Sequence, residues 1–146
     1  MKQFFPGIKK IRYEGPDSKN PLAFKHYNPN KKIGKKTMKE HLRFSVAFWH
    51  TFKGTGSDPF GGPVYDRPWD IANDCMQQAE NTMRAAFEFF TKLGVPFYCW
   101  HDRDIAPEAD NLKETNARLK NIVNLAKKLQ QVKYYEQKKY HSLYWF

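Results

Sequence analysis

A strand–helix–strand order between residues 42 and 100 is the feature that most constrains the fold. Residues 42–49 lack glycine and proline and alternate large apolar side chains with smaller ones, a pattern typical of a strand buried on both faces. Residues 74–93 carry apolar side chains at a helical spacing, and Gly94 follows them directly. Residues 96–100 are a short, mostly aromatic run that favours a second strand. Two strands joined through one helix are expected to be parallel, so the predicted fold class is α/β.

The remaining elements follow from turn, capping and periodicity signals. Residues 1–36 are rich in proline, glycine, asparagine and lysine, which predicts an irregular arm, and a capping-box pair predicts one helical turn at residues 37–41. A long loop at residues 54–73 is typical of a functional or disordered segment. A last helix is predicted over residues 112–130. The two long helices are expected to bury Met76, Ala79, Met83, Ala86, Phe87 and Phe90, and Leu112, Leu119, Ile122, Val123, Ala126 and Leu129.

The formal net charge of +10 raises the hypothesis of nucleic-acid binding. Residues 1–40 carry eleven basic and three acidic side chains, and residues 111–146 carry eight and two. The central residues 41–110 carry six basic and ten acidic side chains. Because the positive charge lies in the flanks and the best-patterned segment is acidic, nucleic acid is not the expected partner.

Cysteine use and hydropathy predict a cytoplasmic protein without a membrane anchor. Cys75 and Cys99 are too few for a disulfide framework, and they lack the spacing of a metal site. No segment approaches the roughly 20 apolar residues that span a bilayer. The first residues lack the apolar stretch of a secretory signal.

The segment from Tyr98 to Asp104 holds the most chemistry, because an apolar run ends there at His101. Ionisable groups just beyond the carboxyl end of a strand lie where α/β folds place ligands and reactions. The spacing of His101 and Asp104 predicts an imidazole that a carboxylate holds in one tautomer, which is a usable acid or base near neutral pH. The alternative hypothesis is that the pair is an ordinary loop cap.

Four segments resemble the start of the xylose isomerases, and in particular the subgroup with an extended N-terminal arm. They are KIRYEGPDSKNPLAFK at residues 10–25, TMKEHLRFSVAFWHT at 37–51, DPFG at 58–61 and FEFFTKLGVPFYCWHDRDIAPE at 87–108. The resemblance extends over residues 3–130, and its motifs occur in the order that the family has.

The resemblance implies a (β/α)₈ TIM barrel that assembles as a homotetramer and interconverts D-xylose and D-xylulose, and often D-glucose and D-fructose. It implies that one imidazole nitrogen of His101 binds the ring oxygen of the sugar and assists ring opening, while Asp104 holds the other imidazole nitrogen. It places Trp49 in the wall of the substrate pocket and Phe60 in the site of a neighbouring subunit. The family uses two divalent cations (Mg²⁺, Mn²⁺ or Co²⁺), whose ligands have no counterparts in this chain.

A complete barrel of this type needs about 250 residues, so the chain is expected to be a truncated fragment. The predicted organisation is an arm at residues 1–41, the first two βα units of a barrel at residues 42–130 and a divergent tail at residues 131–146. A fragment with an uncovered sheet is expected to be poorly soluble or loosely packed, and inactive as an isomerase on its own. The alternatives are a non-enzymatic basic protein that binds nucleic acid or an acidic partner, and a non-functional gene remnant.

Overall fold

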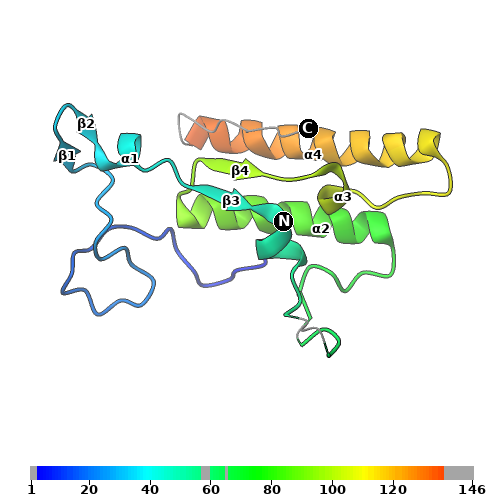
Figure 1. Ribbon diagram of the computed structural model, residues 1–146, viewed down its shortest axis with the longest axis horizontal. Coiled ribbons are helices and arrows are strands. Elements are labelled where there is room, and N and C mark those ends of the chain that lie inside the picture. Colours follow the sequence, from blue (N-terminus) through cyan, green and yellow to red (C-terminus); the bar gives the residue numbers. More distant parts are fainter. Residues whose placement is uncertain (1–2, 57–59, 65, 137–146) are drawn as a thin grey trace.

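The computed structural model describes residues 3–56, 60–64 and 66–136, without the side chains of residues 132–136 (Figure 1). Its elements, in chain order, are the strands β1 (Lys32–Ile33) and β2 (Lys36–Thr37), the helix α1 (Met38–His41), the strand β3 (Ser45–Ala47), the π-helix η1 (Trp49–Lys53), the helix α2 (Cys75–Leu93), the strand β4 (Phe97–Cys99) and the helices α3 (Asp102–Ile105) and α4 (Leu112–Glu136). No helix in these residues combines the length and hydropathy needed to cross a membrane.

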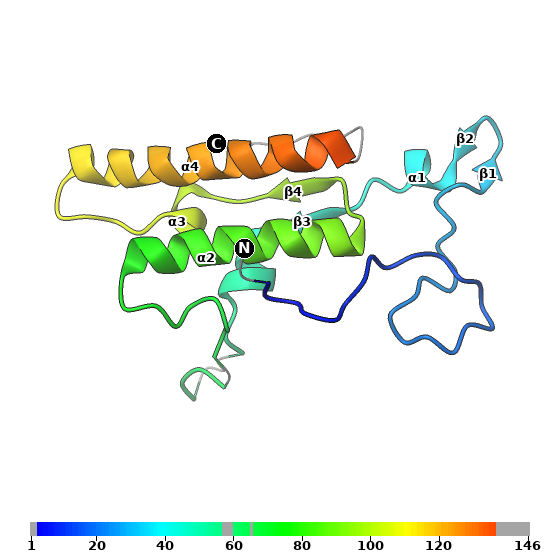
Figure 2. The same ribbon diagram turned by 180° about the vertical axis from the view of Figure 1, so that it is seen from behind.

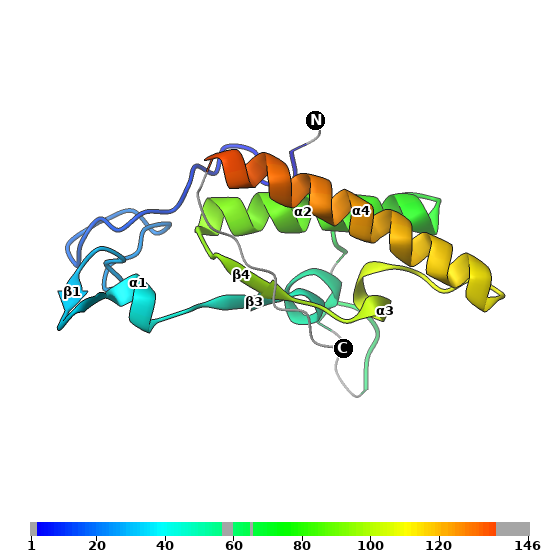
Figure 3. The same ribbon diagram turned by 90° about the horizontal axis from the view of Figure 1, so that it is seen from above.

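The centre of the structure is the parallel pair of β3 and β4. Ser45 pairs with Phe97, and Ala47 pairs with Cys99. Helix α2 connects the two strands, α4 packs against α2, and both helices lie on the same side of the strand pair (Figure 3). The predicted α/β class and the parallel pairing are therefore confirmed. The described residues form small sheets and no closed barrel.

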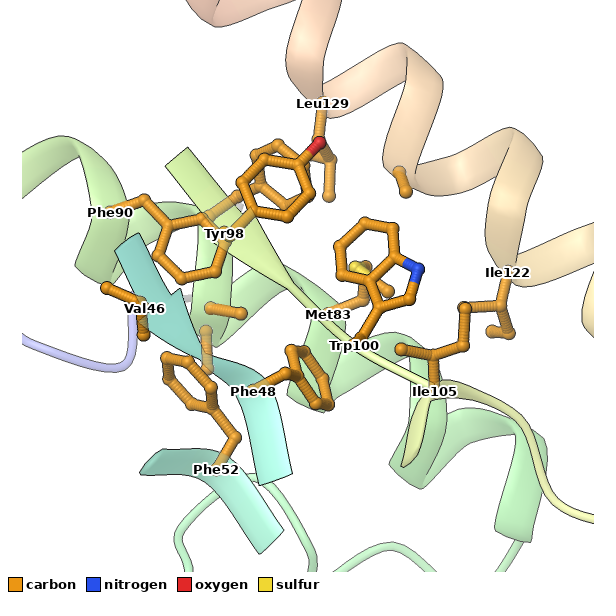
Figure 4. Close-up of a cluster of buried hydrophobic side chains, with 14 of the residues drawn as sticks. Val46, Phe48, Phe52, Met83, Phe90, Tyr98, Trp100, Ile105, Ile122 and Leu129 are labelled. Atoms are coloured by element: carbon orange, nitrogen blue, oxygen red, sulfur yellow. The ribbon is translucent and has the colours of Figure 1, made fainter. Parts of the chain in front are cut away.

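The strands bury one face against the two helices. Side chains alternate along a strand, and Val46, Phe48, Tyr98 and Trp100 point into the buried cluster that lies between strands and helices (Figure 4). The ring of Tyr98 stacks on Trp100 and on Phe90 of α2, with centroid separations of 4.6 Å and 5.0 Å. Each large side chain removed from water in this way contributes about 1.5–3 kcal/mol, so this cluster fixes the strands on the helices.

The predicted stripe of α2 is confirmed in Met83, Ala86, Phe87 and Phe90, which are all buried. In α4, Ile122, Ala126 and Leu129 are buried as predicted. Leu112 was wrongly expected in this stripe: it is the first residue of α4, and its side chain is largely exposed.

Both ends of α2 lie where the sequence predicts them. The carboxylate of Asp74 accepts hydrogen bonds from the backbone N–H groups of Met76 and Gln77, which caps the first turn. Gly94 ends the helix with φ at 77°, a conformation that is unstrained only without a Cβ atom. Helix α4 begins as predicted but continues to Glu136, six residues past the expected end, and residues 137–146 of the predicted tail lie outside the described residues.

Strand β3 is shorter than the predicted strand over residues 42–49. It ends at Ala47, because Phe48 takes a helical backbone conformation (φ −62°, ψ −45°) and leads directly into η1. Trp49 therefore begins a helix instead of ending a strand. The short helix α3 after β4 was also not predicted, since four residues carry too little periodicity to reveal a helix.

The arm contains more regular structure than expected. Strands β1 and β2 form an antiparallel hairpin, and α1 confirms the predicted helical turn. Together they lie beyond the amino ends of β3 and β4, whereas η1 and α3 lie beyond the carboxyl ends (Figures 1 and 2). The backbone N–H of Ile11 donates to the carbonyl of Lys92 at 2.7 Å, which ties the arm to the end of α2.

The first described residues of the arm are held by one carboxylate of α2. Glu88 accepts hydrogen bonds from the backbone N–H groups of Phe4 (2.8 Å) and Phe5 (3.2 Å), and it pairs with Lys92 at 2.7 Å. The rings of Phe4 and Phe5 then pack against Trp69, with centroid separations of 6.3 Å and 5.9 Å. Glu88 thus anchors the start of the arm to α2, where its two aromatic rings pack against the long loop.

Replacement of Glu88 by glutamine should make this anchor weaker and less dependent on pH. Burial by itself raises the pKa of Glu88, but the hydrogen bonds from Lys92, Phe4 and Phe5 outweigh it, so the pKa lies below its usual value. Such a group stabilises the fold at neutral pH, and the stabilisation is lost as the pH falls through the lowered pKa. Glu88→Gln should lower the free energy of unfolding at pH 7 by about 1–2 kcal/mol and flatten its acid dependence, as measured by urea denaturation.

The matched control is Glu80→Gln on the same helix. Among the described residues, Glu80 pairs with Arg84 at 3.7 Å, in a partly exposed i,i+4 contact. Its loss should change the free energy of unfolding by less than about 0.5 kcal/mol. Equal effects of the two substitutions would contradict the anchoring role of Glu88.

Candidate active site

Strand β4 carries His101 to the carboxyl end of the parallel pair. The preceding residue, Trp100, is buried among the helices, and His101 continues in an extended conformation (φ −101°, ψ 163°). Successive side chains of an extended segment point to opposite faces, so His101 points away from the helical layer. Its side chain keeps 60% of its exposure and can therefore meet a ligand from solution.

Asp104 holds the imidazole of His101 from the first turn of α3. Its Oδ2 atom lies 2.9 Å from Nδ1 of His101 and also accepts the backbone N–H of His101 at 2.8 Å. A carboxylate can only accept hydrogen bonds, so Nδ1 of the neutral ring carries the proton and Nε2 keeps a lone pair. The sequence leaves a loop cap and a tautomer-fixing pair as alternatives. In the structure the same oxygen of Asp104 makes both contacts.

Trp49 lies directly beside this pair. Its ring centroid is 4.6 Å from that of His101, with an interplanar angle of 37°. The pairing of Ala47 with Cys99 explains this contact, because Trp49 and His101 each follow two residues after a partner of that pair. The structure therefore brings together Trp49, His101 and Asp104.

Phe60 is placed differently from the other three. It lies in a turn of the loop that follows η1, and its side chain is fully exposed. This exposure distinguishes it from Trp49, which packs against His101, and from Asp104, which is mostly buried.

Sequence relatives of the chain are known over most of its length. The chain is 58% identical over 125 residues to a xylose isomerase of Caldanaerobacter subterraneus subsp. yonseiensis, which is 86% of the chain and 28% of that relative. It is 57% identical over 129 residues to a xylose isomerase of Xanthomonas oryzae pv. oryzae and to xylose isomerase 2 of Xanthomonas campestris pv. campestris, in each case 88% of the chain and 29% of the relative. No protein-family model matches the chain. The chain is related to the xylose isomerases.

The relationship confirms the resemblance that the sequence motifs carry, and it also shows its limit. The chain spans less than a third of the length of the curated xylose isomerases that it matches. The similarity thus favours the resemblance to the xylose isomerases over a basic interaction protein.

The described residues present no ligand set for the divalent cations that the resemblance implies. In the part of the chain that the structure describes, no group of three or more histidine, cysteine, aspartate or glutamate side chains could hold a metal ion. Asp102, next to His101, is instead hydrogen-bonded to the backbone N–H of Arg103 at 2.8 Å. The residues that the structure describes therefore do not form a two-metal centre by themselves.

A cavity of the structure is lined by residues other than these. It has a volume of about 790 Å³ and lies between the arm and the amino ends of the strands, where Tyr27, Phe44 and Val95 contribute to its wall. Burial lowers the pKa of Lys10 on its rim, and the nearby charges of Arg12 and Lys39 add to this shift. None of the four predicted site residues lines this cavity.

Two residues that support the site were missed by the sequence interpretation. Arg67 and Trp69 lie in the loop at residues 54–73, and both donate hydrogen bonds to the end of η1. The side chain of Trp69 is only 4% exposed. The sequence signal was the Arg-Pro-Trp segment at residues 67–69, because an arginine and a tryptophan so close together are unusual in a loop otherwise rich in glycine and proline.

Replacement of Asp104 by asparagine should change the tautomer of His101. The carboxylate requires a proton on Nδ1, whereas an amide can also donate, so the neutral ring of Asp104→Asn should shift towards the Nε2–H form. Imidazole ¹⁵N chemical shifts at alkaline pH measure the two populations. The control is Asp102→Asn, because Asp102 is the direct sequence neighbour of His101 but its carboxylate accepts the backbone N–H of Arg103; this substitution should leave the tautomer unchanged. A dominant Nε2–H form in the unmodified chain would contradict the assignment.

Proposed function

We propose that this chain supplies the ring-opening part of a xylose isomerase site, with D-xylose as substrate and D-glucose as a further aldose. The observation that carries the proposal is the 2.9 Å contact of Asp104 with Nδ1 of His101, made beside Trp49 at the carboxyl ends of two parallel strands. The kinship with proteins named xylose isomerase supports it.

His101 is the proton carrier in this proposal. Opening an aldopyranose breaks the C1–O5 bond, forms the C1=O1 double bond and moves one proton from O1 to O5. The lone pair of Nε2 accepts the proton from O1, and the imidazolium then donates it to O5. Asp104 keeps Nδ1 protonated and stabilises the imidazolium through the same hydrogen bond, so both residues are assigned to catalysis.

Trp49 and Phe60 form the apolar wall of the proposed pocket. The indole of Trp49 offers a flat apolar surface next to the imidazole, against which the carbon face of a sugar can pack. The exposed ring of Phe60 stands on a loop and is proposed to enter the site of a neighbouring subunit in a homotetramer. A wall of this kind excludes water, which the later hydride shift between C2 and C1 requires.

The proposed architecture is the start of a (β/α)₈ barrel. Residues 1–41 are the arm, residues 42–130 the first two βα units, and residues 131–146 a divergent tail. The parallel strands with both helices on one side support this assignment, because the opposite face, with Ser45 and Cys99, is left for a barrel interior. A cytoplasmic location belongs to the same proposal.

The isomerisation step itself is assigned to no residue of this chain. Two divalent cations, Mg²⁺, Mn²⁺ or Co²⁺, supply electrostatic stabilisation in the family, and the described residues present no ligand set for them. The chain alone is therefore expected to open an aldose ring without producing a ketose.

Exchange between the α and β anomers of D-xylose tests the proposal. Ring opening is the slow step of this exchange, and exchange NMR spectroscopy or polarimetry measures its rate. The unmodified chain should accelerate the exchange, and His101→Asn should reduce the protein-dependent rate by about 10²-fold, since general acid–base catalysis contributes at least this much.

The matched control is His41→Asn, because His41 is an exposed histidine of the arm whose ring lies 3.0 Å from the carbonyl of Ile33. It accounts for catalysis by any surface imidazole and should leave the rate unchanged. An equal loss in both variants would refute the role of His101, and formation of D-xylulose by the unmodified chain would contradict the restriction to ring opening.

A further inference from the structure

The π-helix η1 determines where Trp49 lies. Its i→i+5 pattern is visible in the hydrogen bond from the backbone N–H of Gly54 to the carbonyl of Trp49, at 3.0 Å. π-helices are rare and often occur at functional sites, because they are less favourable than the i→i+4 pattern and need support from the surrounding structure. The turn is also tight: a Cβ atom at Gly54 would come within 2.9 Å of the carbonyl oxygen of His50.

The support comes from two side chains of the following loop. The indole Nε1 of Trp69 donates to the carbonyl of Phe52 at 3.0 Å, and Nε of Arg67 donates to the carbonyl of Gly54 at 2.8 Å. Carbonyl groups at the carboxyl end of a helix have no partner within the helix, so each of these donors satisfies a group that the turn leaves open. The guanidinium of Arg67 lies 5.5 Å from the ring centre of Trp69, which couples the two donors.

Trp69 is itself fixed from several sides. Its ring packs against Phe52 of η1 at a centroid separation of 5.7 Å, and against Phe4 and Phe5 of the arm. Glu88 holds the backbone of these two arm residues. A continuous set of contacts therefore runs from α2 through the arm and Trp69 to η1.

We propose that Trp69 is a positioning residue, which together with Arg67 keeps η1 in the π-helical form that places the indole of Trp49 against His101. Without the hydrogen bonds from Trp69 and Arg67, η1 can relax to the i→i+4 pattern. This change rotates Trp49 relative to β3 and moves its indole away from the imidazole of His101. The inference rests on the proposed function for the purpose of the Trp49–His101 contact, but the contact can be measured without any sugar.

The ring current of Trp49 provides the readout. At 4.6 Å, the indole should displace the Hε1 and Hδ2 proton signals of His101 from the positions that they take in a Trp49→Leu reference, and His101→Asn assigns these signals. Trp69→Phe keeps an aromatic ring in the core and removes the N–H donor. It should abolish the displacement.

Phe89→Leu is the matched control for lost packing. Phe89 contacts the same rings, at 5.6 Å from Phe52 and 5.8 Å from Phe5, but its side chain has no hydrogen-bonding group to offer η1. It should preserve the displacement. If both variants keep it, or both lose it, the donor of Trp69 has no specific role and the proposal is overturned.

A second variant decides the case in which Trp69→Phe does not fold, as judged from its methyl and amide NMR spectra. Arg67→Met keeps the aliphatic stem and removes the donor to Gly54, so it should reduce the displacement of the His101 signals; an unchanged displacement then overturns the proposal. If Trp69→Phe abolishes the displacement but the unmodified chain does not accelerate anomer exchange, the proposed function is refuted and the positioning role stands. If the unmodified chain accelerates the exchange but Trp69→Phe keeps the displacement, only the positioning role is refuted.

Discussion

The parallel pairing of β3 with β4 is the constraint on which the site depends. Its register sets Ala47 opposite Cys99, so the two segments that leave the strands carry Trp49 and His101 to the same point. The register in turn depends on the aromatic cluster, because a shift of one residue would turn Tyr98 and Trp100 out of the core. The packing of apolar side chains thus fixes the contact between Trp49 and His101 to which the proposed function assigns a role.

The segment from His101 to Asp104 combines the start of a helix with a fixed imidazole orientation. One oxygen of Asp104 accepts both the backbone N–H and the ring N–H of His101, so the start of α3 and the tautomer of the imidazole are set together. The consequence is that the side chain with the greater exposure, His101, is held by one that is mostly buried, Asp104. A ring held in this way keeps its orientation at the surface without being enclosed.

Periodicity and capping predicted those parts of the fold that depend on local sequence. The stripe of α2 with Asp74 and Gly94 at its ends was sufficient to place the helix, and the aromatic run before His101 was sufficient to place β4. The end of β3 could not be predicted in this way, since residues 42–49 read as an unbroken strand. The π-helix that replaces its last part needs hydrogen-bond donors from Arg67 and Trp69, and these approach only once the loop has folded back. The pair of His101 and Asp104 was found because both partners lie within one turn, whereas the support of Trp49 is non-local.

In the proposed function, the exposed face of the sheet is what distinguishes ring opening from the hydride shift that follows it. In the described residues, β3 and β4 form a sheet of two strands, with Ser45 exposed and Cys99 partly exposed on the face away from the helices. Proton transfer between O1 and O5 tolerates water, because a proton lost to solvent is readily replaced. A hydride shift does not, and it needs a site that is closed on all sides. In the proposed function, the arrangement of Trp49, His101 and Asp104 accordingly serves the opening of the sugar ring, and the hydride shift is not assigned to the exposed face of these two strands.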